Sequence, residues 1–172
     1  GSRARTVEGL RSPPGGAVVT SDLRIGSGLD VHPFAADGAG RRLVLGGVTV
    51  AESGGLEGHS DADVVTHAVA DALLGAVAGG DLGSRVGVDD PAVEGAESIT
   101  LLTVVVRDLA AAGWRPVNLD LTVVAQRPRL APHRDAMRAS LAGAVTLPPE
   151  SVSVKFTTTD GLGAVGRGEG IA

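Results

Sequence analysis

The fold is organised around one stretch, Gly58-His59-Ser60-Asp61-Ala62-Asp63-Val64-Val65-Thr66-His67, which runs on into a predicted helix. After it, apolar pairs recur at helical spacing, at Val64/Val65, Ala68/Val69, Ala72/Leu73 and Ala76/Val77. This period is typical of a helix with one buried face. The predicted N-cap is Ser60, with Asp63 as its capping partner, and a glycine C-cap is predicted near Gly79-Gly80.

The same stretch carries ligand-type side chains. Asp63, His67 and Asp71 are four residues apart and lie along one edge of the helix. His59 and Ser60 stand at its N-terminus, where unpaired N–H groups and the helix dipole attract anions. The pattern predicts a metal ligand on the side of the helix and a phosphate at its tip. Asp71 either orients the imidazole of His67 or is a solvated helix residue.

Composition limits the class of protein. The 172 residues are enough for one domain with a core, and since aromatic residues make up only 2%, that core must consist of Val, Leu and Ala. A net charge of -5 argues against broad nucleic-acid binding. Because cysteine is absent, a metal would need His and carboxylate ligands. No apolar run is long enough to span a bilayer, so we expect a cytoplasmic protein without membrane contact.

The chain divides into a leader and one domain. Residues 1–22 hold a Pro13-Pro14-Gly15-Gly16 break and no periodicity, and we interpret them as a disordered leader or linker. Their arginines also fit the remnant of a transit peptide, which would place the protein in a plastid. The domain proper is predicted to cover residues 23–172.

Helical and strand patterns alternate along this domain. Strands are predicted at 23–25, 43–45, 48–50, 119–125 and 152–156, with a hairpin turn at Gly46-Gly47. Further helices are predicted at 98–112 and from Pro132 to Ala144, and residues 81–91 are interpreted as an irregular acidic loop. The order indicates an α+β fold with a mixed sheet of four to five strands and helices on one face, an α/β sandwich.

A second group of ligand-type residues precedes the first hairpin. Asp30 and His32 point to the same side of an extended segment, since strand side chains alternate. With His67 they make three N/O ligands, the number that a catalytic zinc uses while one position stays open. The alternative is that all three are ordinary hydrogen-bonded polar residues, and the residues alone leave the two readings about equal.

Two later segments suit phosphates and nucleotides. Thr157-Thr158-Thr159-Asp160 offers hydroxyls for phosphate oxygens and a carboxylate for a divalent ion, although a threonine-rich strand and turn would read the same way. Gln126-Arg127-Pro128-Arg129 is a basic loop that either faces a nucleotide or is simply solvated.

Taken together, the motifs resemble the 2-C-methyl-D-erythritol 2,4-cyclodiphosphate synthase family. The resemblance covers residues 23–172 in unbroken order. It rests on Asp30-Val31-His32, the stretch from Gly58 to His67, Gly80 to Gly83, Ala125 to Pro128, Thr157 to Asp160 and Gly166 to Gly170. Family chains continue past Ala172 into a final strand, so that strand is expected to be missing here.

The resemblance implies metal and catalytic roles. Asp30, His32 and His67 correspond to the ligands of one zinc ion per subunit. Asp160 corresponds to a carboxylate that holds a second divalent ion, Mg²⁺ or Mn²⁺, on the substrate diphosphate. His59 and Thr158 match the catalytic positions that stabilise the transition state.

It also implies the substrate contacts. These are Asp30, Val31, His32, His59, Ser60, Asp81, Leu82, Gly83, Val86, Gly87, Val88, Asp89, Asp90, Ala125, Gln126, Arg127, Pro128, Arg129, Leu130, Ala131, Thr157, Thr158, Thr159, Asp160, Ala164 and Arg167. Among them, 81–83 match a ribose-contacting turn, 86–90 a loop over the erythritol, and 125–131 the cytosine pocket.

The implied reaction is that of a phosphorus–oxygen lyase of non-mevalonate isoprenoid synthesis. In 4-diphosphocytidyl-2-C-methyl-D-erythritol 2-phosphate, the 2-phosphate attacks the β-phosphorus, and CMP and the cyclic diphosphate are the products. The implied assembly is a chorismate-mutase-like homotrimer with active sites between subunits. Two other classes of function stay open, a non-catalytic trimeric scaffold and a metal-dependent phosphohydrolase.

Overall fold

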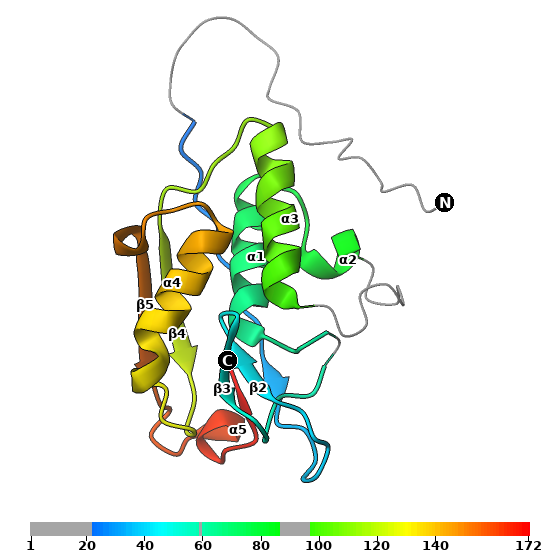
Figure 1. Ribbon diagram of the computed structural model, residues 1–172, viewed down its shortest axis with the longest axis vertical. Helices are drawn as coiled ribbons and strands as arrows, with labels where there is room; N and C mark the ends of the chain where they lie inside the picture. Colours follow the sequence, from blue (N-terminus) through cyan, green and yellow to red (C-terminus); the bar gives the residue numbers. More distant parts are fainter. Residues whose placement is uncertain (1–21, 59, 87–96) are drawn as a thin grey trace, which may run out of the picture.

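The computed structural model describes residues 22–58, 60–86 and 97–172 (Figure 1). The strands are β1 (His32–Pro33), β2 (Leu43–Leu45), β3 (Val48–Ala51), β4 (Leu119–Val124), β5 (Val152–Thr157) and β6 (Gly170–Ile171). The α-helices are α1 (Val64–Ala76), α2 (Leu82–Val86), α3 (Ser98–Ala111), α4 (Arg134–Ala144) and α5 (Gly163–Gly166), with 3-10 turns at Ala131–His133 and Pro149–Ser151. The predicted leader lies outside the described residues except for Asp22.

The strands form three pairs rather than the predicted single sheet. In the described residues β4 and β5 pair in parallel, while β2–β3 and β1–β6 are antiparallel. One bridge, between Ala125 and Ile171, joins the end of β4 to β6. The α+β class is therefore confirmed, with both parallel and antiparallel pairing, but the prediction of one sheet of four to five strands is wrong for these residues.

The strand predicted at 23–25 does not form. Leu23 and Ile25 are 73% and 90% exposed, and the segment has no ladder partner among the described residues. A groove of about 1050 Å³ is lined on one side by residues 22–30 and on the other by residues of β4. Because this groove keeps the two apart, apolar alternation in residues 23–25 finds no strand to pair with.

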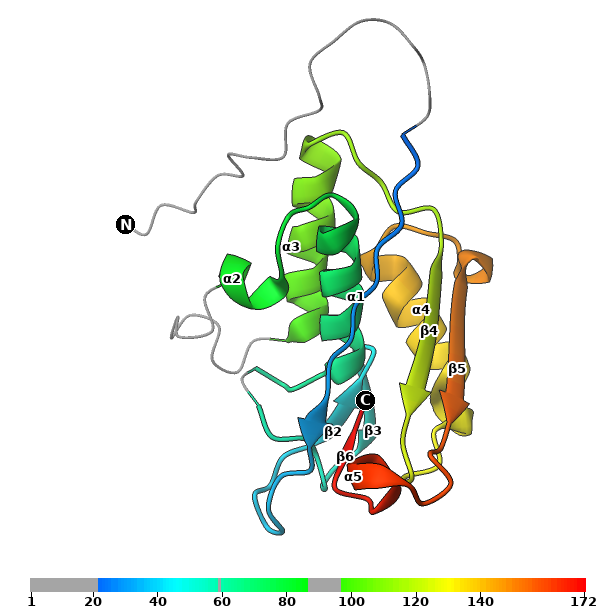
Figure 2. The same cartoon turned by 180° about the vertical axis from the view of Figure 1, so that it is seen from behind.

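Helices lie together on one side of the strands. Figure 2 shows residues 22–33 running in front of α1, and β4 and β5 in front of α4. α1 packs against α3, and α3 against α4. The core between them is aliphatic, as composition requires, and its largest fully buried side chains include Leu45, Leu74, Leu102 and Met137. In the described part of the chain, no helix has the length and apolar character needed to cross a membrane.

Most of the predicted turns, helices and strands are confirmed, and the third helix begins at a different residue. The hairpin is confirmed, with Gly46 and Gly47 at φ 59° and 73°, conformations that glycine adopts without strain. So are the helix that begins at Ser98 and the strands at 119–124 and 152–157. The third helix begins later than predicted, because Pro132 lies in a 3-10 turn that precedes α4.

The boundaries of the central helix are corrected. α1 starts at Val64, and its N-cap is Asp63 rather than Ser60, since the Asp63 carboxylate accepts hydrogen bonds from the N–H groups of Val65 and Thr66. Its last helical residue is Ala76, before the predicted glycine cap. The acidic loop predicted at 81–91 also contains regular structure, the short helix α2.

Candidate metal centre and active site

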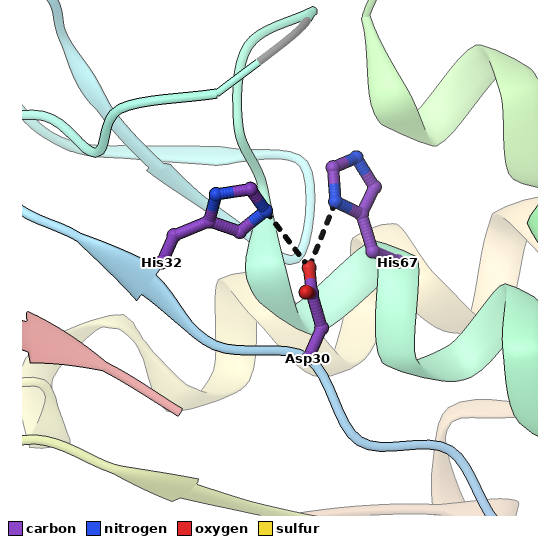
Figure 3. A group of neighbouring side chains, drawn as sticks. All are labelled: Asp30, His32 and His67. Carbon is purple, nitrogen blue, oxygen red and sulfur yellow. Dashed lines mark hydrogen bonds and ion pairs between the residues drawn. The ribbon is translucent and has the colours of Figure 1, made fainter. Parts of the chain in front are cut away.

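The structure brings Asp30, His32 and His67 together (Figure 3). Oδ2 of Asp30 lies 3.0 Å from Nε2 of His32 and 2.9 Å from Nδ1 of His67. The three ligand atoms all lie within 4.8 Å of one another. All three side chains are half-buried, so the donor atoms converge at the protein surface. The sequence prediction that these residues form one group is confirmed.

Glycines place Asp30 and His32 against the helix that carries His67. A Cβ on Gly26 would lie 1.7 Å from the carbonyl oxygen of Ala72, and one on Gly28 would lie 2.0 Å from that of Ala68. Only glycine therefore lets residues 22–30 lie directly on α1. Gly26 and Gly28 therefore allow the close approach that brings Asp30 and His32 to α1.

His32 is also fixed on its other side. β1 pairs with β6, with His32 opposite Ile171. The Nδ1 atom of His32 lies 2.6 Å from the carbonyl oxygen of Glu57. Since a carbonyl only accepts, Nδ1 carries a proton and donates it, which leaves the Nε2 lone pair of the neutral ring free to face Asp30. This is the tautomer that a metal bound at Nε2 requires.

The donor set fits a divalent metal ion. With metal–ligand bonds of about 2.0–2.1 Å, the donors of a tetrahedral zinc site stand about 3.3 Å apart. The separations of 2.9 and 3.0 Å around Oδ2 of Asp30 are close to that value. Two imidazoles and one carboxylate also match the ligands of catalytic zinc sites, which leave a fourth position open.

Charge coupling within the group is strong. Burial alone would raise the pKa of Asp30, but hydrogen bonds and positive charge from His32 and His67 outweigh it and hold the pKa far below its usual range. The hydrogen bond to Asp30 raises the pKa of His32, against the opposing effect of burial. Asp30 is therefore an anion at any pH where the protein works.

Two contact residues were missed by the sequence analysis, Ser98 and Asp61. Nε2 of His67 lies 2.9 Å from Oγ of Ser98, and that hydroxyl donates to the Oδ1 atom of Asp61. The Ser98 N–H donates to Oδ2 of the same carboxylate at 3.2 Å. The sequence offered Ser98 only as a helix start, and nothing in it links this serine to a histidine 31 residues earlier.

Asp63 of the central stretch and Asp71, further along α1, have structural contacts. Asp71 accepts a hydrogen bond of 2.7 Å from the N–H of Leu82, so it anchors α2; of its two predicted roles, it fulfils neither. Asp63 is fully buried and also accepts from the N–H groups of Gly46 and Gly47, which ties the hairpin turn to α1. Burial raises the pKa of Asp63, while these hydrogen bonds oppose the rise.

Ser60 lies in the loop before α1, close to Asp30, His32 and His67, which are called the metal group below. Its Oγ lies 3.2 Å from Oγ of Ser98, and its carbonyl accepts from the Arg41 guanidinium at 2.8 Å. Ser60 has φ 53°, the left-handed region. His59, predicted to be catalytic together with Thr158, lies outside the described residues.

The predicted ribose turn is ordered by its own side chains. Asp81 accepts from the N–H of Ser84 at 2.7 Å, at the start of α2, and Leu82 is buried. Gly83 and Val86 belong to α2. The rest of the predicted erythritol loop, Gly87, Val88, Asp89 and Asp90, lies outside the described residues.

A second group of predicted site residues gathers at the ends of β4 and β5. The N–H of Ala125 donates to the carbonyl of Thr157 at 3.0 Å, which places the 125–131 segment beside residues 157–160. Oγ1 of Thr158 donates to Oδ1 of Asp160 and accepts from its N–H, both at 3.2 Å. Oγ1 of Thr159 donates to the carbonyl of Leu162.

Within this second group, residues 125–131 differ in their exposure to solvent. Gln126, Arg127, Arg129 and Ala131 are exposed, while Ala125 and Leu130 are buried. The Arg127 guanidinium lies 4.8 Å from the ring centroid of Phe34 and donates to the Gly168 carbonyl, and the peptide before Pro128 is cis.

Two further predicted contacts lie near α5. Arg167 is paired with Glu169 through an Nε–Oε1 contact of 2.5 Å, and this ion pair lowers the pKa of the exposed glutamate. Ala164, within α5, is exposed, and so is Val31 beside the metal group, at 55%.

Within one chain, the metal group of Asp30, His32 and His67 is separated from residues 125–131 and 157–160. β6 pairs with β1, which carries His32, and is bridged on its other side by Ala125 at the end of β4. The metal group therefore lies on one side of β6, and residues 125–131 and 157–160 lie on the other.

Comparisons with known proteins agree with this arrangement of motifs. A family model described as the YgbB family matches residues 23–172. A curated relative, the 2-C-methyl-D-erythritol 2,4-cyclodiphosphate synthase of Moorella thermoacetica, is 54% identical over 150 residues, covering 87% of this chain and 90% of the relative.

Solved structures of the same kind are also similar. A 2C-methyl-D-erythritol-2,4-cyclodiphosphate synthase in its CDP-bound form has a TM-score of 0.77 at 34% identity, covering 86% of this chain and 94% of that one. The bifunctional IspDF of Campylobacter jejuni has a TM-score of 0.76 at 34% identity, and here the match spans 86% of this chain but only 39% of the larger one. The chain therefore belongs to the YgbB family, together with the 2-C-methyl-D-erythritol 2,4-cyclodiphosphate synthases to which it is similar.

Proposed function

We propose that this protein is a 2-C-methyl-D-erythritol 2,4-cyclodiphosphate synthase, a lyase of isoprenoid precursor synthesis. It converts 4-diphosphocytidyl-2-C-methyl-D-erythritol 2-phosphate to the cyclic diphosphate and CMP. The observation that carries the proposal is the convergence of Asp30, His32 and His67, in a chain 54% identical to a curated synthase of this name. Two histidines and an anionic carboxylate with one open side suit a metal that contacts phosphate oxygens.

The reaction needs positioning and charge neutralisation more than a protein nucleophile. An oxygen of the 2-phosphate forms a bond to the β-phosphorus, and the bond from that phosphorus to the bridging oxygen breaks. CMP leaves with the bridging oxygen and its electron pair. Both reacting groups are anionic, so the site must hold them together against repulsion. The chain needs no activated serine or cysteine for this step.

Metal ions have two proposed positions. Asp30 Oδ2, His32 Nε2 and His67 Nδ1 would hold zinc, and Asp160 would hold Mg²⁺ or Mn²⁺ on the diphosphate. When bound, such cations draw negative charge from the phosphate oxygens and so stabilise the transition state. The support for the first position is the geometry above, and for the second it is an exposed carboxylate whose own contact is the Thr158 hydroxyl.

The remaining substrate contacts follow from the family resemblance. His59, Ser60 and Thr158 would receive the phosphates, 81–83 the ribose, and 125–131 the cytosine, with Arg127 and Arg167 as nearby cations. The solved relative with bound CDP supports a cytidine diphosphate as ligand class. Residues 86–90, Ala164 and Val31 complete the proposed contacts. The cytoplasmic location, the leader at 1–22 and the single domain over residues 23–172 stay predictions.

We also propose that the active enzyme is a homotrimer with shared active sites. Its support is the position of β6, which separates the metal group from residues 125–131 and 157–160 within one chain. A substrate with a phosphate at one end and cytosine at the other would join halves from two neighbouring chains. Symmetric packing of three copies supplies three such sites.

The test is a product assay with the full chain, zinc and magnesium. The diphosphocytidyl substrate is added, and the products are followed by ³¹P NMR and by chromatography for CMP. We expect equal amounts of CMP and cyclic diphosphate. CMP together with linear phosphates would instead favour the phosphohydrolase, and a bound substrate without turnover would favour the scaffold.

The metal assignment has a separate test. We expect His67→Ala to lose zinc and activity together, since it removes one of three ligands. His133→Ala, in the 3-10 turn before α4, is the matched control and should keep both. Full activity of metal-stripped His67→Ala would refute the assignment.

A further inference from the structure

The Ser98 hydroxyl contacts both His67 of the metal group and Ser60 in the loop before α1. Ser98 begins α3, its side chain is 0% exposed, and its Oγ lies 2.9 Å from Nε2 of His67. The same oxygen contacts the carboxylate of Asp61 and lies 3.2 Å from Oγ of Ser60. A buried hydroxyl with three polar neighbours has its proton direction set by which of them can only accept.

Asp61 sets that direction. An ionised carboxylate has no proton to donate, so the Ser98 hydroxyl must donate to Asp61, which also accepts the Ser98 N–H. The lone pairs of Oγ are then left for His67 and Ser60. A lone pair facing Nε2 of His67 favours a proton on that nitrogen.

From this geometry we infer that Asp61 and Ser98 are positioning residues which fix His67 as the tautomer with the proton on Nε2 and the lone pair on Nδ1, the atom that faces Asp30. This inference rests on the proposed metal site. Hydrogen-bond partners of this kind orient metal-binding histidines and raise their basicity. Here the relay runs from Asp61 through Ser98 to His67, so α3 and the loop before α1 both determine the metal affinity.

The relay also fixes the remaining lone pair. With one proton given to Asp61 and one accepted from His67, Oγ of Ser98 can accept one more, and the Ser60 hydroxyl is at 3.2 Å. Ser60 would then keep its own lone pairs free toward the helix tip. Ser98 thus links the metal group to Ser60, one of the residues proposed to receive a phosphate.

The first experiment measures zinc affinity directly, without substrate. Full-length protein is freed of metal, and its dissociation constant for Zn²⁺ is found by competition with a chromophoric chelator. Because loss of such a partner costs roughly 10- to 100-fold in metal affinity, we expect Ser98→Ala to weaken binding by that factor. Ser98→Thr, which keeps the hydroxyl, should restore most of it.

Thr103→Ala is the matched control. It deletes an exposed hydroxyl on the same helix, one that donates to the Ile99 carbonyl, and its zinc affinity should stay at the wild-type value. Wild-type affinity in Ser98→Ala would overturn the inference. Absence of zinc binding by the wild type would overturn the metal site and, with it, the proposed function.

A double-mutant cycle tests whether Asp61 acts through Ser98. Asp61→Asn should weaken zinc binding in the wild-type background, yet change it by no more than about twofold in the Ser98→Ala background. Equal effects in both backgrounds would mean that Asp61 acts independently, and the relay would be wrong.

A spectroscopic readout tests the tautomer of His67 directly, first in the wild type and then in Ser98→Ala. In ¹⁵N-labelled, zinc-loaded wild type, long-range proton–nitrogen spectra of the four histidines should show one ring with a slowly exchanging Nε2 proton and a metal-bound Nδ1. Ser98→Ala should shift that Nε2 resonance and speed its exchange, which a merely structural role would leave unchanged. Zinc bound at Nε2 of His67 would overturn the proposal.

Discussion

His32 is held at both ring nitrogens, and this makes its protonation sensitive to the state of the metal site. Nδ1 donates to the Glu57 carbonyl, and Nε2 lies 3.0 Å from Oδ2 of Asp30. In the metal-free protein a proton on Nε2 forms an ion pair with Asp30. A metal bound at Nε2 would require that proton to leave, since it would take the lone pair.

The first prediction concerns the pH dependence of metal-free stability. The hydrogen bond to Asp30 raises the pKa of His32 above its ordinary value of 6.5. A raised pKa in the folded state means that this contribution to stability is complete below pH 6.5 and is lost as pH rises through the folded-state value. We expect the Tm difference between wild type and His32→Gln, in EDTA, to be larger at about pH 6 than at about pH 8.5.

His133→Gln provides the reference for that measurement, because it removes an imidazole outside the metal group. Its Tm difference from wild type should vary less between the two pH values. If the His32→Gln difference were the same at both, the Asp30–His32 ion pair would contribute no stability.

At this scale the sequence predicted that Asp30, His32 and His67 form one group, but it did not predict the residues that support them. Asp30 and His32 are two residues apart, and His67 belongs to a periodic helix, so local patterns made them candidates, and the family resemblance then assigned them to a metal. Ser98 and Asp61 are invisible to such patterns, because their roles depend on a buried contact between segments 37 residues apart. Asp71 had the right helical spacing to support His67, but the N–H of Leu82 is its partner instead.

Among the elements, the junction of the hairpin and α1 depends on Asp63. Its carboxylate accepts from the N–H groups of Gly46, Gly47, Val65 and Thr66 and from the Thr66 hydroxyl. One side chain therefore caps the helix and closes the hairpin turn against it. Asp63 rather than Ser60 is therefore the N-cap, because its carboxylate also accepts hydrogen bonds from the N–H groups of the hairpin turn.

The second prediction follows from that junction. Asp63→Ala removes a helix cap and leaves the N–H groups of buried Gly46 and half-buried Gly47 without this acceptor, so we expect it to cost at least about 2 kcal/mol of unfolding free energy. Urea unfolding of the metal-free protein measures the change. Asp135→Ala is the control, since this first-turn acid of α4 is exposed and should change stability by about 0.5 kcal/mol or less.

The third prediction concerns the contact between residues 22–30 and α1. Gly26→Ala would place a methyl group 1.7 Å from the Ala72 carbonyl oxygen, so the segment must move away from the helix. Asp30 ends that segment and His32 follows it, so we expect at least about a tenfold loss of zinc affinity, with the helices retained by circular dichroism.

Gly143→Ala is the matched control for that variant. A Cβ at Gly143, in α4, meets nothing within 4 Å, so zinc affinity should be unchanged. Stability should rise slightly, because alanine is the better helix former. Unchanged zinc affinity in Gly26→Ala would show that the segment adjusts without moving the ligands.

For the elements, helical periodicity and turn chemistry were reliable where packing agreed with them. Gly46-Gly47 predicted a hairpin, and the apolar spacing from Ser98 predicted α3. The failure at Leu23 and Ile25 is different in kind. Alternation predicts a strand only if a partner strand is adjacent, and here a groove lies between this segment and β4.

Across the whole molecule, β6 is the element that organises the site. Two residues long, it pairs with β1 on one side and is bridged to the end of β4 on the other. No local pattern predicts this, because the pairing joins His32 to Ile171 across most of the domain. Its consequence is that Asp30, His32 and His67 and the residues at the ends of β4 and β5 face different surroundings.

The fourth prediction tests whether two chains complete one site. His67→Ala damages the zinc half, and Thr158→Ala damages the other half, so each homotrimer should be nearly inactive. When the two are co-expressed and assemble at random, a site that combines Asp30, His32 and His67 of one chain with Thr158 of its neighbour is intact at about a quarter of the interfaces. We therefore expect about a quarter of the wild-type rate from the mixed trimers.

Two controls make that result specific. Separately purified homotrimers, mixed without subunit exchange, should show only the sum of their residual rates, and so should co-expression of either variant with the double variant. If both halves of the site belonged to a single chain, every chain in the mixture would carry one defect and no interface could restore activity. Recovery of activity therefore requires that the two halves of one site, which β6 separates within a chain, come from neighbouring chains. Sedimentation of an active monomer would contradict the shared site.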